Sequence, residues 1–143
     1  RIITPMVGEG KLTADEGETA LRETMRLIEM PALADVFGPL SRAEVPVSGM
    51  LGKHVVSGII DRLVISDDVV TIIDFKTGPS PKKGGEVNAS YIAQQAIYAH
   101  VLRQIWQDRQ VQAGLIYTED ASLYWIDPSD MERMIAPLLM AET

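Results

Sequence analysis

The 143-residue sequence contains no cysteine and only two histidines, His54 and His100. The lack of cysteine excludes disulfide bonds, thiolate metal sites and a cysteine-bound iron–sulfur cluster in this chain. No apolar run approaches the roughly 18 residues that a membrane-spanning helix needs, and no signal-peptide pattern is present. These features predict a cytoplasmic protein without a membrane partner.

Basic side chains are also scarce, because 13 Lys and Arg stand against 20 Asp and Glu, which gives a net charge of −7. Proteins that bind nucleic acid normally contact phosphate through Lys and Arg, so this balance is unusual for that class. A cation site would account for part of the acidity. The length and the 46% hydrophobic content indicate one globular domain with a proper core.

Residues 1–12 contain a proline and two glycines and are expected to form a flexible lead-in, with a single domain over residues 13–143. A helix is predicted over about 14–30, ended by Pro31, with a short helical turn within 32–38. The first residue is Arg1 rather than Met, so we expect the chain to be a fragment of a larger protein.

The remaining pattern predicts an α/β fold of the α+β type, in which helices flank a mixed sheet of about five strands. The expected order is helix, three strands, helix, two strands, helix. After the first helix, the expected elements are a strand over 43–48, a hairpin of two strands around 66–68, a helix over 88–107, strands over 111–117 and 122–126, and a helix over 130–140.

The hairpin holds the most informative residues. If Asp67 and Asp68 form a two-residue loop, Asp61 lies opposite Asp74, and Lys76 shares their face two residues further on. We expect this face to be completed by apolar side chains, namely Ile59, Leu63, Val70 and Ile72. Opposed carboxylates among apolar neighbours repel each other unless a cation or a shared proton intervenes. The hairpin therefore predicts a functional site at these carboxylates.

Oxygen ligands favour a hard cation such as Mg²⁺ or Mn²⁺, which can activate water and neutralise charge on a phosphodiester. In this interpretation Asp61 and Asp74 bind the metal, and Lys76 stabilises charge or orients the attacking water. Glu44 is a further candidate ligand, or only a strand-edge acid. Arg62 is expected to form a structural ion pair behind the site. The alternative is a strand pair with solvated edge carboxylates, against which the apolar surroundings count.

At these residues the chain resembles the PD-(D/E)xK nucleases: Gly58-x-x-Asp61-Arg62, followed by Asp74-Phe75-Lys76, is similar to their metal motif. The later Tyr91-x-x-Gln94-x-x-x-Tyr98 is similar to the motif of the RecB-like branch. Over residues 40–126 the sequence most resembles the AddA type of helicase–nuclease subunit.

This resemblance implies metal ligation by Asp61, Asp74 and the backbone carbonyl of Phe75. It also implies that Gln94 and Tyr98, with Tyr91 in the same stripe, hold a DNA strand, although the bare pattern fits amphipathic core residues as well. RecB-like nucleases carry a metal-binding histidine on an earlier helix, yet residues 1–53 contain none. We expect that helix to lie upstream.

The loop after Gly78 carries Lys82 and Lys83, which either contact DNA phosphate or are merely solvated. The implied function is Mg²⁺-dependent exonuclease activity within an ATP-dependent helicase–nuclease of double-strand break repair. The implied partners are DNA, the helicase part of the same polypeptide and an AddB-like subunit. The alternatives are a catalytically silent scaffold with the nuclease fold and a stand-alone RecB-like exonuclease.

Overall fold

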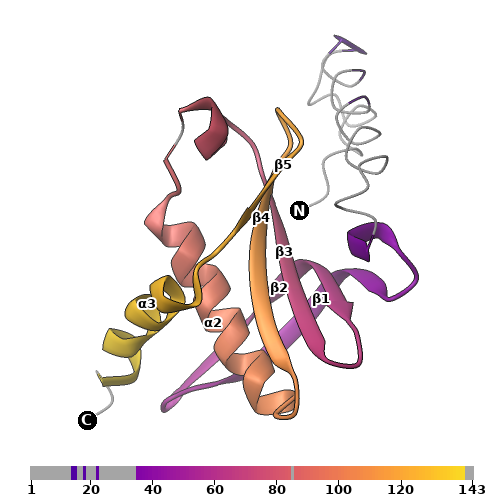
Figure 1. Cartoon of the computed structure of the whole chain (residues 1–143). Coiled ribbons are helices and arrows are strands. Elements are labelled where there is room, and N and C mark those ends of the chain that lie inside the picture. The colour runs from indigo at the N-terminus through magenta and orange to yellow at the C-terminus, as the bar shows by residue number, and fades with distance from the viewer. Residues whose placement is uncertain (1–13, 16–17, 19–21, 23–34, 85, 141–143) are drawn as a thin grey trace.

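The structure, a computed structural model, describes residues 14–15, 18, 22, 35–84 and 86–140. Figure 1 shows a mixed sheet with two helices on one of its sides. The predicted lead-in over 1–12 lies outside the described residues, as does most of the predicted helix over 14–30. The four described residues within that helix are helical.

The sheet contains five strands: β1 (Ser41–Leu51), β2 (His54–Ile65), β3 (Val69–Lys76), β4 (Gln110–Tyr117) and β5 (Ser122–Trp125). The helices are α2 (Ala89–Ile105) and α3 (Pro128–Met140), and two short 3₁₀ turns are η3 (Asp35–Phe37) and η4 (Pro81–Lys83). The predicted α+β fold with a five-stranded mixed sheet is confirmed. The first strand is longer than predicted, since it starts before residue 43 and continues to Leu51.

The strand order follows the chain, β1-β2-β3-β4-β5. Consecutive strands pair antiparallel except β3 and β4, which are parallel. A parallel pair needs a crossover connection, and α2 supplies it by running back along the sheet between the two strands. This topology places the C-terminal ends of β3 and β4 side by side, so that Lys76 and Tyr117 are register partners.

The turn between β2 and β3 has the predicted two-residue form. The Ser66 backbone N–H donates to the Val69 carbonyl at 2.9 Å, and the Ser66 hydroxyl binds the same residue. The strands then pair in the predicted register, from Ile65 opposite Val70 to Arg62 opposite Ile73. One further step along this register brings Asp61 level with Asp74.

The core lies mainly between the sheet and α2. Two small residues of α2, Ala96 and Ala99, are buried in this core. The apolar side chains that the strands contribute to it include Ile60, Leu63, Val70, Ile72, Leu115 and Tyr117. The small side chains let α2 approach the strands closely. A second, smaller cluster on the opposite face of the sheet contains Ile73 and Ile116, packed with Phe37 and Phe75.

The helix α2 begins at a side-chain cap, because the Asn88 carboxamide oxygen accepts from the Ser90 N–H at 2.8 Å. Within the described part of the chain, the apolar stretches of the helices are too short or too polar to cross a bilayer.

Candidate active site

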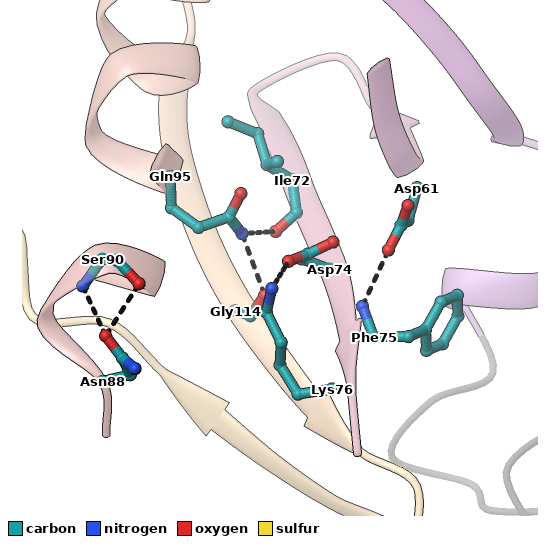
Figure 2. A network of polar contacts seen from close by, with 9 residues as sticks. All are labelled: Asp61, Ile72, Asp74, Phe75, Lys76, Asn88, Ser90, Gln95 and Gly114. Carbon is teal, nitrogen blue, oxygen red and sulfur yellow. Dashed lines mark hydrogen bonds and ion pairs between the residues drawn. The ribbon is translucent and has the colours of Figure 1, made fainter. Parts of the chain in front are cut away.

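Asp61 occupies a break in the ladders of β2. Its neighbours Ile60 and Arg62 both pair with β1, but Asp61 itself does not, and the pairing of β2 with β3 ends at Arg62. The Asp61 carboxylate fills the break: its Oδ2 accepts a hydrogen bond from the Phe75 N–H at 3.0 Å, shown in Figure 2. Only 7% of the residue is exposed, so the acid is held firmly at the edge of the β3 backbone.

This break corrects one part of the predicted face. We expected Ile59 to share a face with Leu63, but Ile59 is 49% exposed and Ile60 is buried in the same cluster as Leu63. Side chains of a regular strand alternate between its two faces, so Ile60 and Leu63 would point to opposite faces. Because both are buried in one cluster, the strand departs from strict alternation between them. On β1 the matching distortion is at Glu44, which has a φ of 50°.

Asp74 and Lys76 come from the end of β3. The Lys76 Nζ lies 2.5 Å from the Asp74 Oδ2, and both side chains are mostly buried. The same Nζ lies 3.9 Å from the centroid of the Tyr91 ring on α2, so the ring face also attracts the ammonium. Lys76 is thus held between a carboxylate and an aromatic ring. Figure 2 shows its ion pair with Asp74.

A glutamine next to the predicted one lies beside this pair. Gln95 is fully buried, and its Nε2 donates to the Gly114 carbonyl at 3.0 Å and the Ile72 carbonyl at 3.4 Å (Figure 2). It therefore links β3 to β4 at Ile72, two residues before Asp74. The sequence reasoning missed Gln95, although it shares a helical stripe with the buried Ala99 and Leu102.

Gln94 and Tyr98, the predicted strand-binding residues, lie on a different side of α2. They line a groove of about 610 Å³ together with Ser90 and part of β2. The Tyr98 hydroxyl lies over Gly58, so closely that a Cβ added there would be 2.3 Å from it. Gln94 is exposed, in contrast to its buried neighbour Gln95.

The donors at the site fit a hard divalent cation. Asp61 and Asp74 supply carboxylate oxygens, and the Phe75 carbonyl supplies a third oxygen. In an extended strand the N–H and C=O of one residue point to the same side, so this carbonyl points with its N–H toward Asp61, beyond the last pair with β2. Mg²⁺ commonly binds one or two carboxylates and keeps several waters, so three protein oxygens match its requirement.

Glu44 does not complete such a set. It lies on β1, level with Asp61, but its side chain is exposed. Among the described residues, no three histidine, aspartate or glutamate side chains gather as a metal cluster. The structure thus brings Asp61, Asp74 and Lys76 to neighbouring positions and leaves Glu44 outside.

Arg62 forms no ion pair among the described contacts, contrary to the prediction. Its guanidinium instead lies 5.2 Å from the centre of the Phe37 ring and donates to the Ser41 hydroxyl. His54 begins β2 and is exposed.

The loop that carries Lys82 and Lys83 is anchored to the sheet. Ser80 is fully buried, and its hydroxyl donates to the Asp120 Oδ2 at 2.5 Å. Asp120 also accepts from the Ser122 hydroxyl at 2.7 Å, which fixes the turn between β4 and β5. Lys82 lies exposed in η4 directly after this anchor.

A separate hollow of about 380 Å³ lies between η3, residues 38–40 and the sheet face opposite α2. Apolar, hydroxyl and amide side chains line it, among them Leu40, Gln112 and Trp125, and none of the described residues in its lining is charged.

Comparisons with known proteins concern the fold and the family of the chain. No curated protein gives a significant match to the chain. Among solved structures, a candidate exonuclease from Eubacterium rectale superposes with a TM-score of 0.68 at 17% identity, covering 96% of this chain and 54% of that one. This chain therefore spans about half the length of that structure, and the likeness shows a shared fold.

Two other solved structures are more distant. The protein SSO0001 gives a TM-score of 0.42 at 15% identity, with 88% of this chain and 68% of that chain covered. The protein VC1899 from Vibrio cholerae gives 0.38 at 15% identity, with 91% and 36% covered. The family model for the PD-(D/E)XK nuclease superfamily matches residues 9–137, which is most of the sequence, and the chain therefore belongs to this superfamily.

Proposed function

We propose that this domain hydrolyses phosphodiester bonds of DNA with the help of a divalent cation, Mg²⁺ or Mn²⁺, and acts as an exonuclease. The observation that carries the proposal is the meeting of Asp61, from within β2, with Asp74 and Lys76 at the end of β3 in a chain of the nuclease superfamily. A mostly buried Lys–Asp pair beside a second acid is costly to keep in a sheet core, and catalysis supplies a reason for it.

Each protein group has a defined part in this reaction. Asp61, Asp74 and the Phe75 carbonyl are the proposed metal ligands. A divalent cation bound there would acidify a water molecule and neutralise charge on the scissile phosphate. The Lys76 ammonium would donate hydrogen bonds to the oxygen on which charge develops, and the Tyr91 ring below it would keep it pointed at that position.

The remaining site residues hold this arrangement and the substrate. Gln95 fixes the spacing of β3 and β4 through its two carbonyl contacts. We propose that the DNA strand lies along the groove of Gln94 and Tyr98, where polar groups and an aromatic side chain suit a single strand. Lys82, presented by the anchored loop, would add a phosphate contact.

We also propose that the domain works beside a helicase part and an AddB-like subunit in the cytoplasm, as in the AddA type of helicase–nuclease. The net charge of −7 supports this, because an isolated acidic domain repels a polyanion and gains from a basic channel supplied by neighbours. If so, the domain alone should bind single-stranded DNA much more weakly than a complex that includes such partners.

The test is cleavage of linear and covalently closed circular DNA, labelled at either end, by the wild type, Asp74→Asn and Lys76→Met. Each variant should lose about 10²–10³-fold in cleavage rate, since each lacks a ligand or a charge stabiliser. Asp108→Asn, an exposed change in the turn after α2, is the matched control and should cleave normally.

Cleavage of linear but not circular DNA would establish the exonuclease. Cleavage of the circle would show an endonuclease instead. A wild type that cleaves neither substrate in Mg²⁺ or Mn²⁺, with or without a helicase partner, would favour the silent scaffold.

A further inference from the structure

Tyr117 is a buried tyrosine beside the proposed catalytic lysine. It ends β4 and is the direct parallel partner of Lys76 on β3, so the two side chains leave the sheet on the same face. The pairing is secured beyond them, because the Thr118 N–H donates to the Lys76 carbonyl at 3.0 Å. Only 2% of Tyr117 is exposed, and it packs in the core cluster under α2.

The hydroxyl of Tyr117 has no hydrogen-bond partner among the described residues. Burial of a polar group without a partner is destabilising, and such a group in a folded protein requires a reason. Burial raises the pKa of Tyr117, and the nearby Tyr91 and Tyr124 raise it further. The side chain is therefore a neutral phenol at neutral pH, and its oxygen can accept a hydrogen bond.

Lys76 is the cation placed to use that oxygen. Its ammonium has three donors, of which the contact with Asp74 at 2.5 Å occupies one direction and the Tyr91 ring another. Tyr91 also links the two residues in space, since it lies under the Lys76 ammonium and influences the pKa of Tyr117. A metal ion bound by Asp74 would compete with the ammonium for the carboxylate oxygens, and the ammonium would then need another acceptor.

We infer that Tyr117 is a positioning residue: its hydroxyl oxygen accepts a hydrogen bond from the Lys76 ammonium when Asp74 engages the metal. The inference rests on the proposed function, because it requires a metal at Asp74. Tyr117 and the Tyr91 ring then hold the ammonium at the mouth of the site. In this inference the hydroxyl, which has no partner among the described residues, gains its hydrogen bond when a metal is bound at Asp74.

The experiment separates this role from a structural one by using Tyr117→Phe, which keeps the ring and removes the oxygen. Tyr124→Phe, a change in the neighbouring strand, is the matched control. Urea unfolding of the metal-free proteins comes first. Because the hydroxyl has no partner among the described residues in that state, Tyr117→Phe should unfold at the same or a higher urea concentration than the wild type. A clearly lower midpoint would show that the hydroxyl already has a partner, such as a buried water, and would overturn the inference.

Calorimetric titration with Mn²⁺ is the second measurement, on the wild type, Tyr117→Phe, Lys76→Met and the double variant. Tyr117→Phe should weaken Mn²⁺ binding by about tenfold, the size expected for one charge-assisted hydrogen bond. In the Lys76→Met background the same change should have no effect, since no ammonium remains to be held. An equal effect in both backgrounds, or none in either, would contradict the inference.

Cleavage provides the third measurement. Tyr117→Phe should lower kcat by about tenfold and leave KM nearly unchanged, because the bond acts on the lysine and not on the DNA. A wild type that binds Mn²⁺ and cleaves DNA, with a Tyr117→Phe variant that does both equally well, would overturn this inference alone. A wild type that binds no Mn²⁺ would contradict the proposed function, and the positioning role with it.

Discussion

The Asp61 carboxylate stands in for a backbone acceptor, because its Oδ2 takes the hydrogen bond that the Phe75 N–H would otherwise give to a neighbouring strand. Asp61 therefore has two duties: it satisfies a half-buried backbone donor, and its charge is available to a cation. The two duties make different demands on the side chain, so substitutions can separate them.

Asp61→Asn and Asp61→Ala should differ in stability but not in activity. Asparagine keeps an oxygen that can accept from Phe75, and its free energy of unfolding should stay close to that of the wild type. Alanine leaves the N–H unsatisfied and should lose about 1–3 kcal/mol. Both variants lack the negative charge, so both should lose cleavage by at least about 10²-fold. Urea unfolding and a nuclease assay on the same preparations check this. Equal stability of the two variants would show that the Phe75 contact contributes little.

The sequence predicted the hairpin because its register depends on a local feature. Two acidic residues flanked by β-branched runs fit a two-residue turn, and the turn determines every pair that follows. The break at Asp61 has no such local signature. It depends on how β1 pairs with β2, where Glu44 has a positive φ, and strict alternation therefore assigned Ile59 to the wrong face.

The two adjacent glutamines show a similar limit. A motif resemblance favoured Gln94, but neighbouring residues on a helix are about 100° apart, so only one of the two can face the sheet. The packing of Ala99 and Leu102 turns Gln95 inward, and the alanine and leucine spacing was the available signal. The lone hydroxyl of Tyr117 could not be predicted, because it depends on which polar groups meet across three elements.

Gln95→Ala should therefore lower stability, whereas Gln94→Ala should leave stability nearly unchanged. The first removes the hydrogen bonds to the Ile72 and Gly114 carbonyls from a fully buried position, and should lose about 1–3 kcal/mol in the free energy of unfolding. The second changes an exposed side chain and should alter stability by less than about 0.5 kcal/mol. If the groove holds DNA, Gln94→Ala should weaken single-strand binding, measured by fluorescence anisotropy. Loss of stability in the Gln94 variant would contradict the helix orientation.

Gly58 should tolerate no side chain while Tyr98 is present. A Cβ at residue 58 would lie 2.3 Å from the Tyr98 hydroxyl, so Gly58→Ala should lose about 1–3 kcal/mol through forced repacking. Tyr98→Ala removes the obstacle, and adding Gly58→Ala to that variant should cost little more. A double-mutant cycle by urea unfolding measures the coupling. Additive losses would mean that the glycine is needed for another reason.

Lys82→Ala should weaken DNA binding without changing the rate of the chemical step. The exposed ammonium follows the Ser80–Asp120 anchor, and loss of one phosphate contact should reduce the slope of log affinity against log salt by about 0.7–0.9. Lys53→Ala is the control, since Lys53 lies in the turn between β1 and β2. Binding measured from low to moderate salt gives the slope, and parallel lines for the wild type and Lys82→Ala would exclude the contact.

Stability at alkaline pH should depend on Tyr117. Burial raises its pKa in the folded state above the ordinary value of about 10, so the folded protein holds this proton more tightly than the unfolded chain does. The contribution of this proton to the free energy of unfolding is fully present below pH 10. It is lost as the pH rises through the folded-state pKa, at a rate of at most about 1.4 kcal/mol per pH unit for one proton.

Tyr117→Phe has no such proton, so its free energy of unfolding should fall less steeply than that of the wild type above pH 10. Urea unfolding between pH 7 and pH 11 tests this. A difference between wild type and Tyr117→Phe that stays constant over the whole range would mean that the phenol ionises as easily in the folded protein as in water.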